Sequence, residues 1–457
     1  MADRPVRAEL GRLLRLALPM VLTQISQMGM GVADTIMAGR FSAADLAGVA
    51  LGGNLFWPSV LLLSGTLMAL VPAVAQLHGR GHQQHAGEVV RQAGWIAVCG
   101  GAVLAVFYQN VTWFYERIGV DPQAIPIATA YLQALSWGVL PLLGYFALRF
   151  LCEGMSWTLP AMLVAFSGLL LKVPLNYLFI YGGAGVPAMG GVGCGWSSAL
   201  VMWLEFLVLG AVVARSRMRV TGVFDRLSAP DLRQIARLVR LGLPVGLSNF
   251  LEISMFSIVT LLIGRLGVEA VAAHQIATSV GGLAFMAPMA LGMAAAIRVG
   301  FNVGSGNLAA ARRSGWVALA SALAFAVVAG LLILFGREFL AALYSRELAV
   351  LALAGELIVF VALFQLVDDT QVVAMGALRG FKDTRVPMLV ALFAYWVVGL
   401  PVGVVLGFDL VGVPVLAGVR GFWVGLSVGL AVAALILVGR FAWLSRRDEL
   451  IHRLAER

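Results

Sequence analysis

Long apolar runs recur along the whole chain and constrain its fold more than any other feature. We count twelve stretches of about 20 or more mostly apolar residues, each long enough to cross roughly 30 Å of bilayer hydrocarbon as a helix. They lack the period-two alternation of outer-membrane barrel strands. Charged residues are only 12% of the chain, about half the share that is usual in soluble domains. The sequence therefore predicts an all-α integral membrane protein with twelve transmembrane helices.

The positive charge is distributed unevenly between the two sides of this predicted bundle. Of the 32 Lys and Arg residues, 25 fall in the termini and in the loops on their side, Arg149 among them, and six fall in the opposite loops. Cytoplasmic loops carry such an excess of basic residues. We therefore expect both termini in the cytoplasm of a bacterial inner-membrane protein. Membrane orientation explains the net charge of +9 without a nucleic-acid partner.

The two halves of the sequence repeat each other. "LRLALP" at 14–19 matches "VRLGLP" at 239–244, and the same offset of 225 places "AGR" at 38–40 over "IGR" at 263–265. Each half has six spans, so the halves run parallel and a pseudo-two-fold axis along the membrane normal would relate them. We predict an N-lobe at 1–214, a cytoplasmic linker with a short amphipathic helix at 215–237, and a C-lobe at 238–457.

A few ionisable residues lie deep inside the apolar spans: Asp34, Lys172, Glu205, Glu252, Asp368 and Asp369. A charged side chain at the bilayer centre costs about 2.5–3.5 kcal/mol on insertion scales, and such residues usually face a bundle interior and mark ion or proton routes. For Glu205, which stands alone among apolar neighbours, we favour a packing role. Lys172 would be either an internal counter-charge or a side chain that snorkels to the interface.

Polar neighbours support this interpretation for three of the carboxylates. Asp34 shares a helical stripe with Thr23 and Gln27, and it follows Pro19, where a bend is expected. Ser248 lies one turn before Glu252. Asp368 has Gln365 and Gln371 at i−3 and i+3, whereas Asp369 points about 100° away. The spacing does not decide which of the two aspartates faces a cavity.

Other motifs argue against a soluble or ATP-driven enzyme. His78, His82 and His85 fall in a short glycine-containing loop, which we interpret as solvated and not as a metal site. No nucleotide-binding motif occurs, so ion gradients remain as the energy source. Asp368–Asp369 is similar to the paired aspartates of membrane prenyltransferases, but no third Asp follows at the needed spacing. An intramembrane prenyltransferase-type enzyme with a divalent-metal requirement is thus the less favoured alternative.

Six stretches together resemble one transporter family over nearly the whole chain. They are "DTIMAGRFSAADLAGVALG" at 34–52, "KVPLNYLFIYG" at 172–182, "LPVGLSNFLEISMF" at 243–256, "AAHQIA" at 272–277, "RVGFNVGSGN" at 298–307 and "ALRGFKDTRVP" at 377–387. Their order and spacing are similar to those of the multidrug and toxic compound extrusion (MATE) family, in its NorM-type bacterial branch. The resemblance implies an antiporter with two six-helix lobes that exports cationic aromatic drugs in exchange for H⁺ or Na⁺ by alternating access.

The resemblance also assigns roles to residues. Asp34 matches the N-lobe carboxylate, with Asn176 as its neighbour, and Glu252 and Asp368 match the C-lobe pair that binds the coupling cation, H⁺ or Na⁺. Lys172 departs from the neutral polar residue expected in some relatives. Further polar residues are expected to line the substrate cavity: Gln27, Ser248, Gln275, Gln365, Gln371 and Asp369.

A lipid-linked precursor flippase of the same superfamily is the main alternative within transporters. Such a protein would need a strongly basic cavity for pyrophosphate, whereas the interior charges here are mostly acidic. We therefore expect a non-enzymatic, monomeric drug exporter that contacts only small cationic drugs and the lipid bilayer. It would need no cofactor apart from its coupling ion. The sequence does not distinguish H⁺ from Na⁺.

Overall fold

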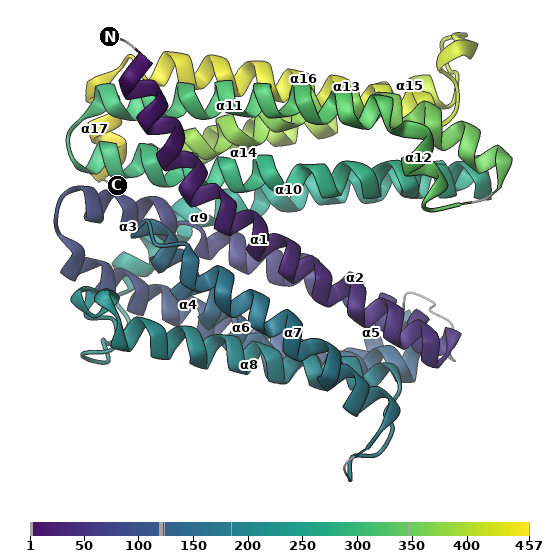
Figure 1. Ribbon diagram of the computed structural model, residues 1–457, viewed down its shortest axis with the longest axis horizontal. Coiled ribbons are helices and arrows are strands. Elements are labelled where there is room, and N and C mark those ends of the chain that lie inside the picture. Colours follow the sequence, from purple (N-terminus) through teal and green to yellow (C-terminus); the bar gives the residue numbers. More distant parts are fainter. Residues whose placement is uncertain (1–2, 118–121, 123, 184, 346, 457) are drawn as a thin grey trace. The chain divides into compact units, whose positions relative to one another are not determined.

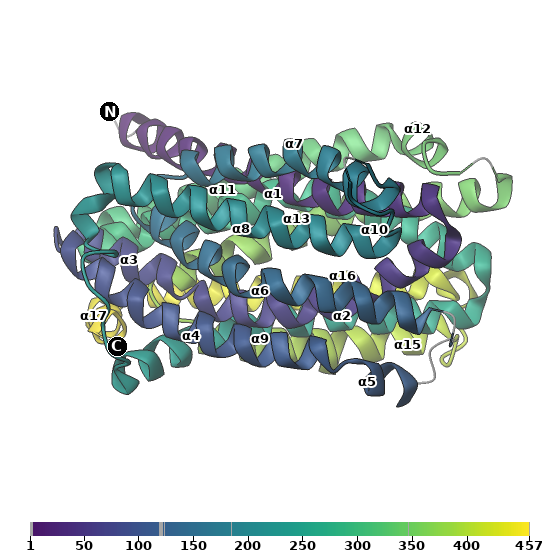
Figure 2. The same cartoon turned by 90° about the horizontal axis from the view of Figure 1, so that it is seen from below.

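The computed structural model describes residues 3–117, 122, 124–183, 185–345 and 347–456. Within these ranges the chain is helical almost throughout, and its only β-type pairing is a single bridge between Gly183 and Val186 (Figures 1 and 2). Twelve helical segments of this described part are long and apolar enough to cross a membrane. The predicted fold class is confirmed: this is an all-α, multi-pass membrane protein.

The first six spans are formed by seven labelled helices, and two short elements lie in their connections. They are α1 (Asp3–Phe41), α2 (Ala43–Leu67) with α3 (Leu70–Gly79), α4 (Gln83–Gln109), α6 (Ile125–Gly154), α7 (Leu159–Tyr181) and α8 (Gly191–Arg215), with α5 (Thr112–Arg117) and the 3₁₀ turn η1 (Arg217–Thr221) in connections.

The second six spans include one helix that changes its winding. They are α9 (Leu232–Ile263), α10 (Val268–Gly304), α11 (Leu308–Phe335), α13 (Leu348–Gly380), α14 (Arg385–Ala391) continued by η3 (Leu392–Gly399) and α15 (Leu400–Gly407), and α16 (Val419–Leu444). Between and after them come η2 (Gly264–Leu266), α12 (Arg337–Ala342), η4 (Pro414–Leu416) and α17 (Asp448–Glu456). The element η3 is a π-helix.

Two compact units divide the chain, and their limits differ from the predicted lobe boundaries. The N-unit is Pro19–Gly246, and the C-unit is Met1–Leu18 with Leu247–Arg457. Helix α1 therefore begins in the C-unit, and α9 begins in the N-unit. Both helices continue unbroken past an internal proline, Pro19 in α1 and Pro244 in α9. Hydropathy marks where a helix spans a membrane, but not against which unit each of its turns packs.

A buried ion pair fixes the first turns of α1 to the rest of the C-unit. Arg298 of α10 donates to both carboxylate oxygens of Glu9, at 2.7 and 2.8 Å. Ser314 of α11 donates to Glu9 at 2.7 Å and accepts from Asn302 at 2.8 Å. A bidentate guanidinium–carboxylate pair is among the stronger polar contacts in proteins. The N-terminal segment of α1 is thus an integral part of the C-unit.

The segment before α9 is docked on α4 of the N-unit. Ser228 donates to Glu88 at 2.7 Å and accepts from Arg91 at 2.8 Å, and its carbonyl accepts from the Trp95 indole at 3.0 Å. Arg91 also donates to the Gly222 carbonyl. The structure of residues 215–237 differs in one respect from the predicted linker. Its C-terminal part, from Leu232 onward, is the first turn of the long helix α9, not a separate amphipathic helix.

Asp231 caps this helix. Its carboxylate accepts the backbone N–H groups of Arg233 at 2.9 Å and Gln234 at 3.3 Å, which satisfies donors that the first helical turn leaves free. These backbone hydrogen bonds, that from Gln234 foremost, hold the pKa of Asp231 below its ordinary value. Asp231 thereby sets where α9 begins.

Glycines bring α10 and α13 into backbone contact, as is common between membrane helices. A Cβ added at Gly376 of α13 would collide with the carbonyl of Gly292 of α10, and one at Gly292 would lie 2.9 Å from the Val372 carbonyl. This close approach fixes the part of α13 that carries Asp368 and Asp369.

Candidate functional site

The N-unit holds a buried polar cluster built around Asp34. The Asn176 amide of α7 donates to Asp34 Oδ1 at 2.7 Å, as the resemblance implied. The Lys172 ammonium, one helical turn earlier on α7, lies 2.9 Å from the same oxygen. All three side chains are buried, and Lys172 is only 1% exposed. Of the two roles left open for Lys172, the structure supports the internal counter-charge and not snorkelling.

Helix α8 completes this cluster with residues that the sequence did not single out. Lys172 Nζ donates to the Cys194 carbonyl at 3.2 Å, to the Ser197 hydroxyl at 2.9 Å and to the Ser198 hydroxyl. Ser197 donates to the Asn176 amide oxygen, and Ser198 donates to Asp34 at 3.4 Å. The adjacent serines in "GCGWSSAL" were the available signal. Hydroxyls are common in transmembrane helices, so this signal does not by itself mark a site.

Gln27 belongs to a second buried cluster of the N-unit, centred on Arg149. Arg149 donates to Glu153 at 2.7 Å, to Gln27 at 3.5 Å and to Gln24 at 3.4 Å. The expectation that Arg149 belongs to a cytoplasmic loop is therefore wrong. The residue is 3% exposed inside α6, because its charge is balanced by Glu153 one turn away. Thr23, also on the predicted stripe, bonds to the Pro19 carbonyl of its own helix at 2.9 Å.

Glu205 of α8 is buried in the same unit. Its Oε1 atom has no hydrogen-bond partner among the described residues, and it lies against Gly168 of α7, with Met30 of α1 close by. The structure thus leaves the predicted packing role of Glu205 open, since a buried carboxyl without a partner is unfavourable unless it is protonated.

The C-unit brings Glu252 and Asp368 together. Glu252 lies on α9 and Asp368 on α13, and the two carboxyl groups are near enough to interact electrostatically. The Tyr395 hydroxyl of η3 donates to Glu252 and accepts from the Gln371 amide at 2.7 Å. Asp368 Oδ1 has no hydrogen-bond partner within the described part of the chain. The two carboxyl groups, one of them with an oxygen that accepts no hydrogen bond, and the Tyr395 phenol form a site that could hold a small cation or a proton.

Asp369 lies near enough to Asp368 to interact with it electrostatically, but it has its own hydrogen-bond partner. Its carboxylate accepts from the Gln365 amide at 2.5 Å, one turn earlier on the same helix, and it is fully buried. Asp368 interacts electrostatically with Glu252, and no such interaction of Asp369 with Glu252 is described. Which of the two aspartates faces a cavity stays a prediction. Gln365, expected in the substrate cavity, donates this hydrogen bond to Asp369, and its place in the cavity stays a prediction.

The π-helical segment η3 positions Tyr395 beside Glu252. A π-turn inserts an extra residue into a helix and often occurs at functional sites. The neighbouring Trp396 indole donates to the Leu251 carbonyl of α9 at 3.3 Å, which fixes η3 against the turn that carries Glu252. Tyr395 stands in the apolar run "LFAYWVVG", where only its hydroxyl and the Trp396 indole are polar, so the sequence did not single it out.

The last two predicted cavity residues lie in different surroundings. Ser248 of α9 is buried. Gln275 of α10 is exposed, and it is its buried neighbour His274 that contacts α9, through the Thr260 hydroxyl at 2.9 Å. Neither has a described hydrogen bond to Glu252 or Asp368, so their roles stay predictions.

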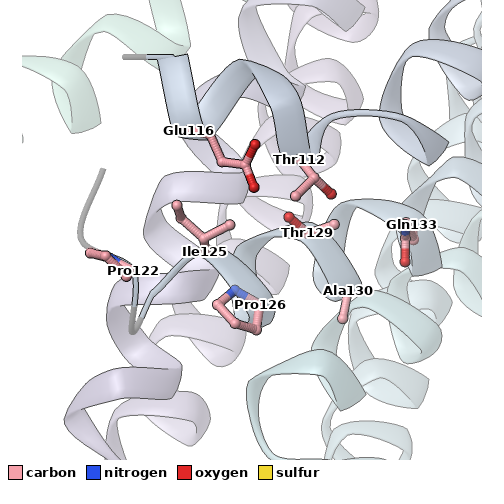
Figure 3. A pocket seen from close by; sticks show the side chains of 8 residues that line it. All are labelled: Thr112, Glu116, Pro122, Ile125, Pro126, Thr129, Ala130 and Gln133. Atoms are coloured by element: carbon pink, nitrogen blue, oxygen red, sulfur yellow. The ribbon is translucent and has the colours of Figure 1, made fainter. Parts of the chain in front are cut away.

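A separate pocket of about 750 Å³ lies between α5 and the start of α6. Glu116 and Thr112 from α5 face Ile125 and Thr129 from α6 across it (Figure 3). It shares no residue with the clusters around Asp34 or Glu252, so it plays no part in the predicted site.

Solved structures of MATE transporters have this fold. The chain matches "Crystal structure of eukaryotic MATE transporter AtDTX14" with a TM-score of 0.86 at 21% identity, covering 99% of each chain. It matches the Vibrio cholerae MATE transporter VcmN in the bent form, also with a TM-score of 0.86, at 17% identity, covering 98% of this chain and 99% of the other. At this identity the likeness establishes the fold.

Sequence comparison then establishes the family. The MatE family model matches residues 19–178 and 244–405. The chain is 42% identical to "Multidrug resistance protein MdtK" of Yersinia pseudotuberculosis serotype O:1b (strain IP 31758), over 95% of each chain. It is equally similar to the protein of that name from Yersinia enterocolitica serotype O:8 / biotype 1B (strain NCTC 13174 / 8081). The chain belongs to the MatE family, as the six sequence stretches implied.

Proposed function

We propose that this protein is a multidrug efflux antiporter that exports small cationic aromatic compounds in exchange for H⁺ or Na⁺. The relatives named as multidrug resistance proteins support the export of drugs. The observation that carries the coupling part is the Glu252–Asp368 pair, held inside the apolar C-unit with Tyr395.

The pair favours cation exchange for an electrostatic reason. Two carboxylates that repel each other away from water cannot both stay charged without a counter-ion, so one proton or one monovalent cation stabilises the closed site. Hydration of the site in another conformation removes that requirement and releases the ion. An ion that binds the two conformations unequally shifts their equilibrium, which is how its gradient can drive the export of a drug.

The surroundings of the other interior charges support export of cations over transport of lipid pyrophosphates. Both interior basic side chains of the N-unit are already paired, Lys172 with Asp34 and Arg149 with Glu153. Such paired cations have little charge left for a pyrophosphate, so the flippase alternative is disfavoured. A prenyltransferase-type role is disfavoured because the Asp369 carboxylate already accepts a hydrogen bond from the Gln365 amide.

We further propose that the protein acts as a monomer in the bacterial inner membrane with both termini in the cytoplasm. The excess of Arg and Lys in the termini and their loops supports this orientation. That excess persists after Arg149 is removed from the loop count, since the opposite loops hold only six basic residues.

Drug-driven ion counterflow in proteoliposomes tests the function. Purified protein would be reconstituted, a cationic dye imposed as a gradient, and Na⁺ and pH varied independently. Movement of H⁺ or Na⁺ opposite to the dye supports antiport. Dye movement that is independent of both ions would overturn it. Glu356→Gln is the matched control for variants of the Glu252–Asp368 pair. Glu356 lies on α13, the helix of Asp368, but it forms an exposed ion pair with Arg420 of α16.

A further inference from the structure

The ammonium group of Lys172 occupies a shell of oxygen atoms drawn from two other helices. Around Nζ lie the Asp34 carboxylate of α1 at 2.9 Å and, from α8, the Cys194 carbonyl at 3.2 Å and the hydroxyls of Ser197, at 2.9 Å, and Ser198. An ammonium has three hydrogens to donate, yet four oxygens surround it. The arrangement is that of a cation in a coordination shell more than of a lysine with a single partner.

Burial makes this arrangement costly unless the charges balance. Lys172, Ser197 and Asp34 are all nearly or fully inaccessible, and a lone ammonium in an apolar span is unfavourable. Lysine side chains usually snorkel toward water, but this one points inward. The cluster carries one negative group, Asp34, and one positive group, Lys172. A monovalent charge therefore balances it, whereas a divalent charge would not.

We propose that this oxygen shell is a monovalent-cation site whose occupant is the chain's own Lys172 ammonium. Lys172 is then the residue that sets the ion specificity of the N-unit, because a tethered cation keeps free Na⁺ and K⁺ out. If the proposed function is correct, the exchangeable coupling ion binds in the C-unit and not at Asp34. The shell itself does not depend on the proposed function.

The ligand chemistry supports this occupant and its replacement by an ion. A carboxylate, a backbone carbonyl and two hydroxyls are hard oxygen donors, which suit cations that prefer oxygen. Lys172→Ala would remove the ammonium and most of its stem while leaving every one of these oxygens. The emptied volume could admit a small cation with water, and Asp34 would be left without its counter-charge.

The test measures Na⁺ binding to detergent-purified full-length protein, so transport is not required. A Glu252→Gln/Asp368→Asn background removes the candidate C-unit site. In that background we expect no saturable ²²Na⁺ binding while Lys172 is present. Adding Lys172→Ala should create saturable binding of a single Na⁺, together with thermal stabilisation by NaCl but not by choline chloride at equal ionic strength. Adding Asp34→Asn should abolish both effects.

Two results would overturn the inference. One is Na⁺ binding in the background protein that requires Asp34 although Lys172 is intact. The other is a folded, monodisperse Lys172→Ala protein that binds no Na⁺. If Lys172→Ala does not fold, Lys172→Gln replaces it, and the arm with intact Lys172 still decides the first result. Binding in the background protein that ignores Asp34→Asn would count against the C-unit assignment in the proposed function, not against this inference.

Discussion

At the residue scale, the Asp34–Lys172 pair changes what a substitution at Asp34 is expected to do. Asp34→Asn should reduce drug export, but it also strands a buried ammonium. Removing one partner of a buried ion pair costs about 3–5 kcal/mol, whereas removing both is often far less harmful. We therefore predict that Asp34→Asn lowers the thermal stability of the detergent-purified protein more than Asp34→Asn/Lys172→Met does.

A double-mutant cycle on melting temperatures checks this prediction, with Lys172→Met as the fourth corner. A loss in the double variant equal to the sum of the two single losses would show that the two groups are not coupled, and Asp34 would then act alone. Export of ethidium-like cations at the normal rate by the single variant would remove Asp34 from the transport site.

Residues were predictable from the sequence where their burial is costly. Glu252, Asp368 and Asp34 could be singled out because a carboxylate in hydrocarbon requires an explanation. Tyr395 and Ser197 could not, since hydroxyls occur in many spans without a functional role. The loop prediction for Arg149 was wrong for a related reason. A basic residue near the end of a span is typical of a loop, and the sequence does not show that Glu153 balances its charge inside the helix.

At the element scale, the N-terminal segment of α1 depends on the Glu9–Arg298 pair. Glu9→Gln would leave the Arg298 guanidinium buried without its charge partner, so we predict that the first turns of α1 detach and become sensitive to protease. Arg12→Gln is the control. Arg12 contacts the same carboxylate at 3.4 Å but is largely exposed, and exposed pairs contribute only about 0–1 kcal/mol.

Limited proteolysis of the solubilised protein, followed by mass spectrometry, measures the protease sensitivity of the first turns of α1. Equal cleavage of both variants near residues 3–18 would contradict an anchoring role for the buried pair.

Two glycines of α13 give a second test, with opposite expected signs. A Cβ at Gly376 would collide with the Gly292 carbonyl of α10, whereas nothing lies within 4 Å of a Cβ at Gly355. Alanine is favoured over glycine inside a helix by about 0.5–1 kcal/mol. We predict that Gly355→Ala leaves the melting temperature unchanged or raises it, and that Gly376→Ala lowers it. The reverse order would show that α10 and α13 are not in backbone contact.

The number of spans could be predicted from hydropathy, but three features of the elements could not. The sequence does not predict the π-helix at Leu392–Gly399, because the residues of this segment are as apolar as those of a transmembrane α-helix. It also does not show that α9 starts at Leu232 and extends the predicted linker into a span. Nor does it show where α1 and α9 pass between units, since that depends on packing.

At the scale of the whole molecule, the distribution of Arg and Lys predicts the orientation in the membrane. We predict that Ser216, between α8 and η1, lies on the cytoplasmic side. A cysteine introduced there should resist an impermeant thiol reagent applied to intact cells and react after the membrane is opened. Because Cys99 is exposed and Cys152 and Cys194 are buried, a variant with all three replaced provides the background. Labelling from outside would reverse the proposed orientation.

The most direct test of the central claim is gradient-driven drug export by Glu252→Gln in proteoliposomes. Gln preserves the shape and most of the hydrogen bonding with Tyr395, so a merely structural role should survive. It can neither alternate between charged and neutral forms nor balance Na⁺. We predict that Glu252→Gln abolishes ion-coupled export while expression and some drug binding persist, and that Glu252→Asp retains partial activity. Transport by the Gln variant at the wild-type rate under an imposed H⁺ or Na⁺ gradient would contradict the account.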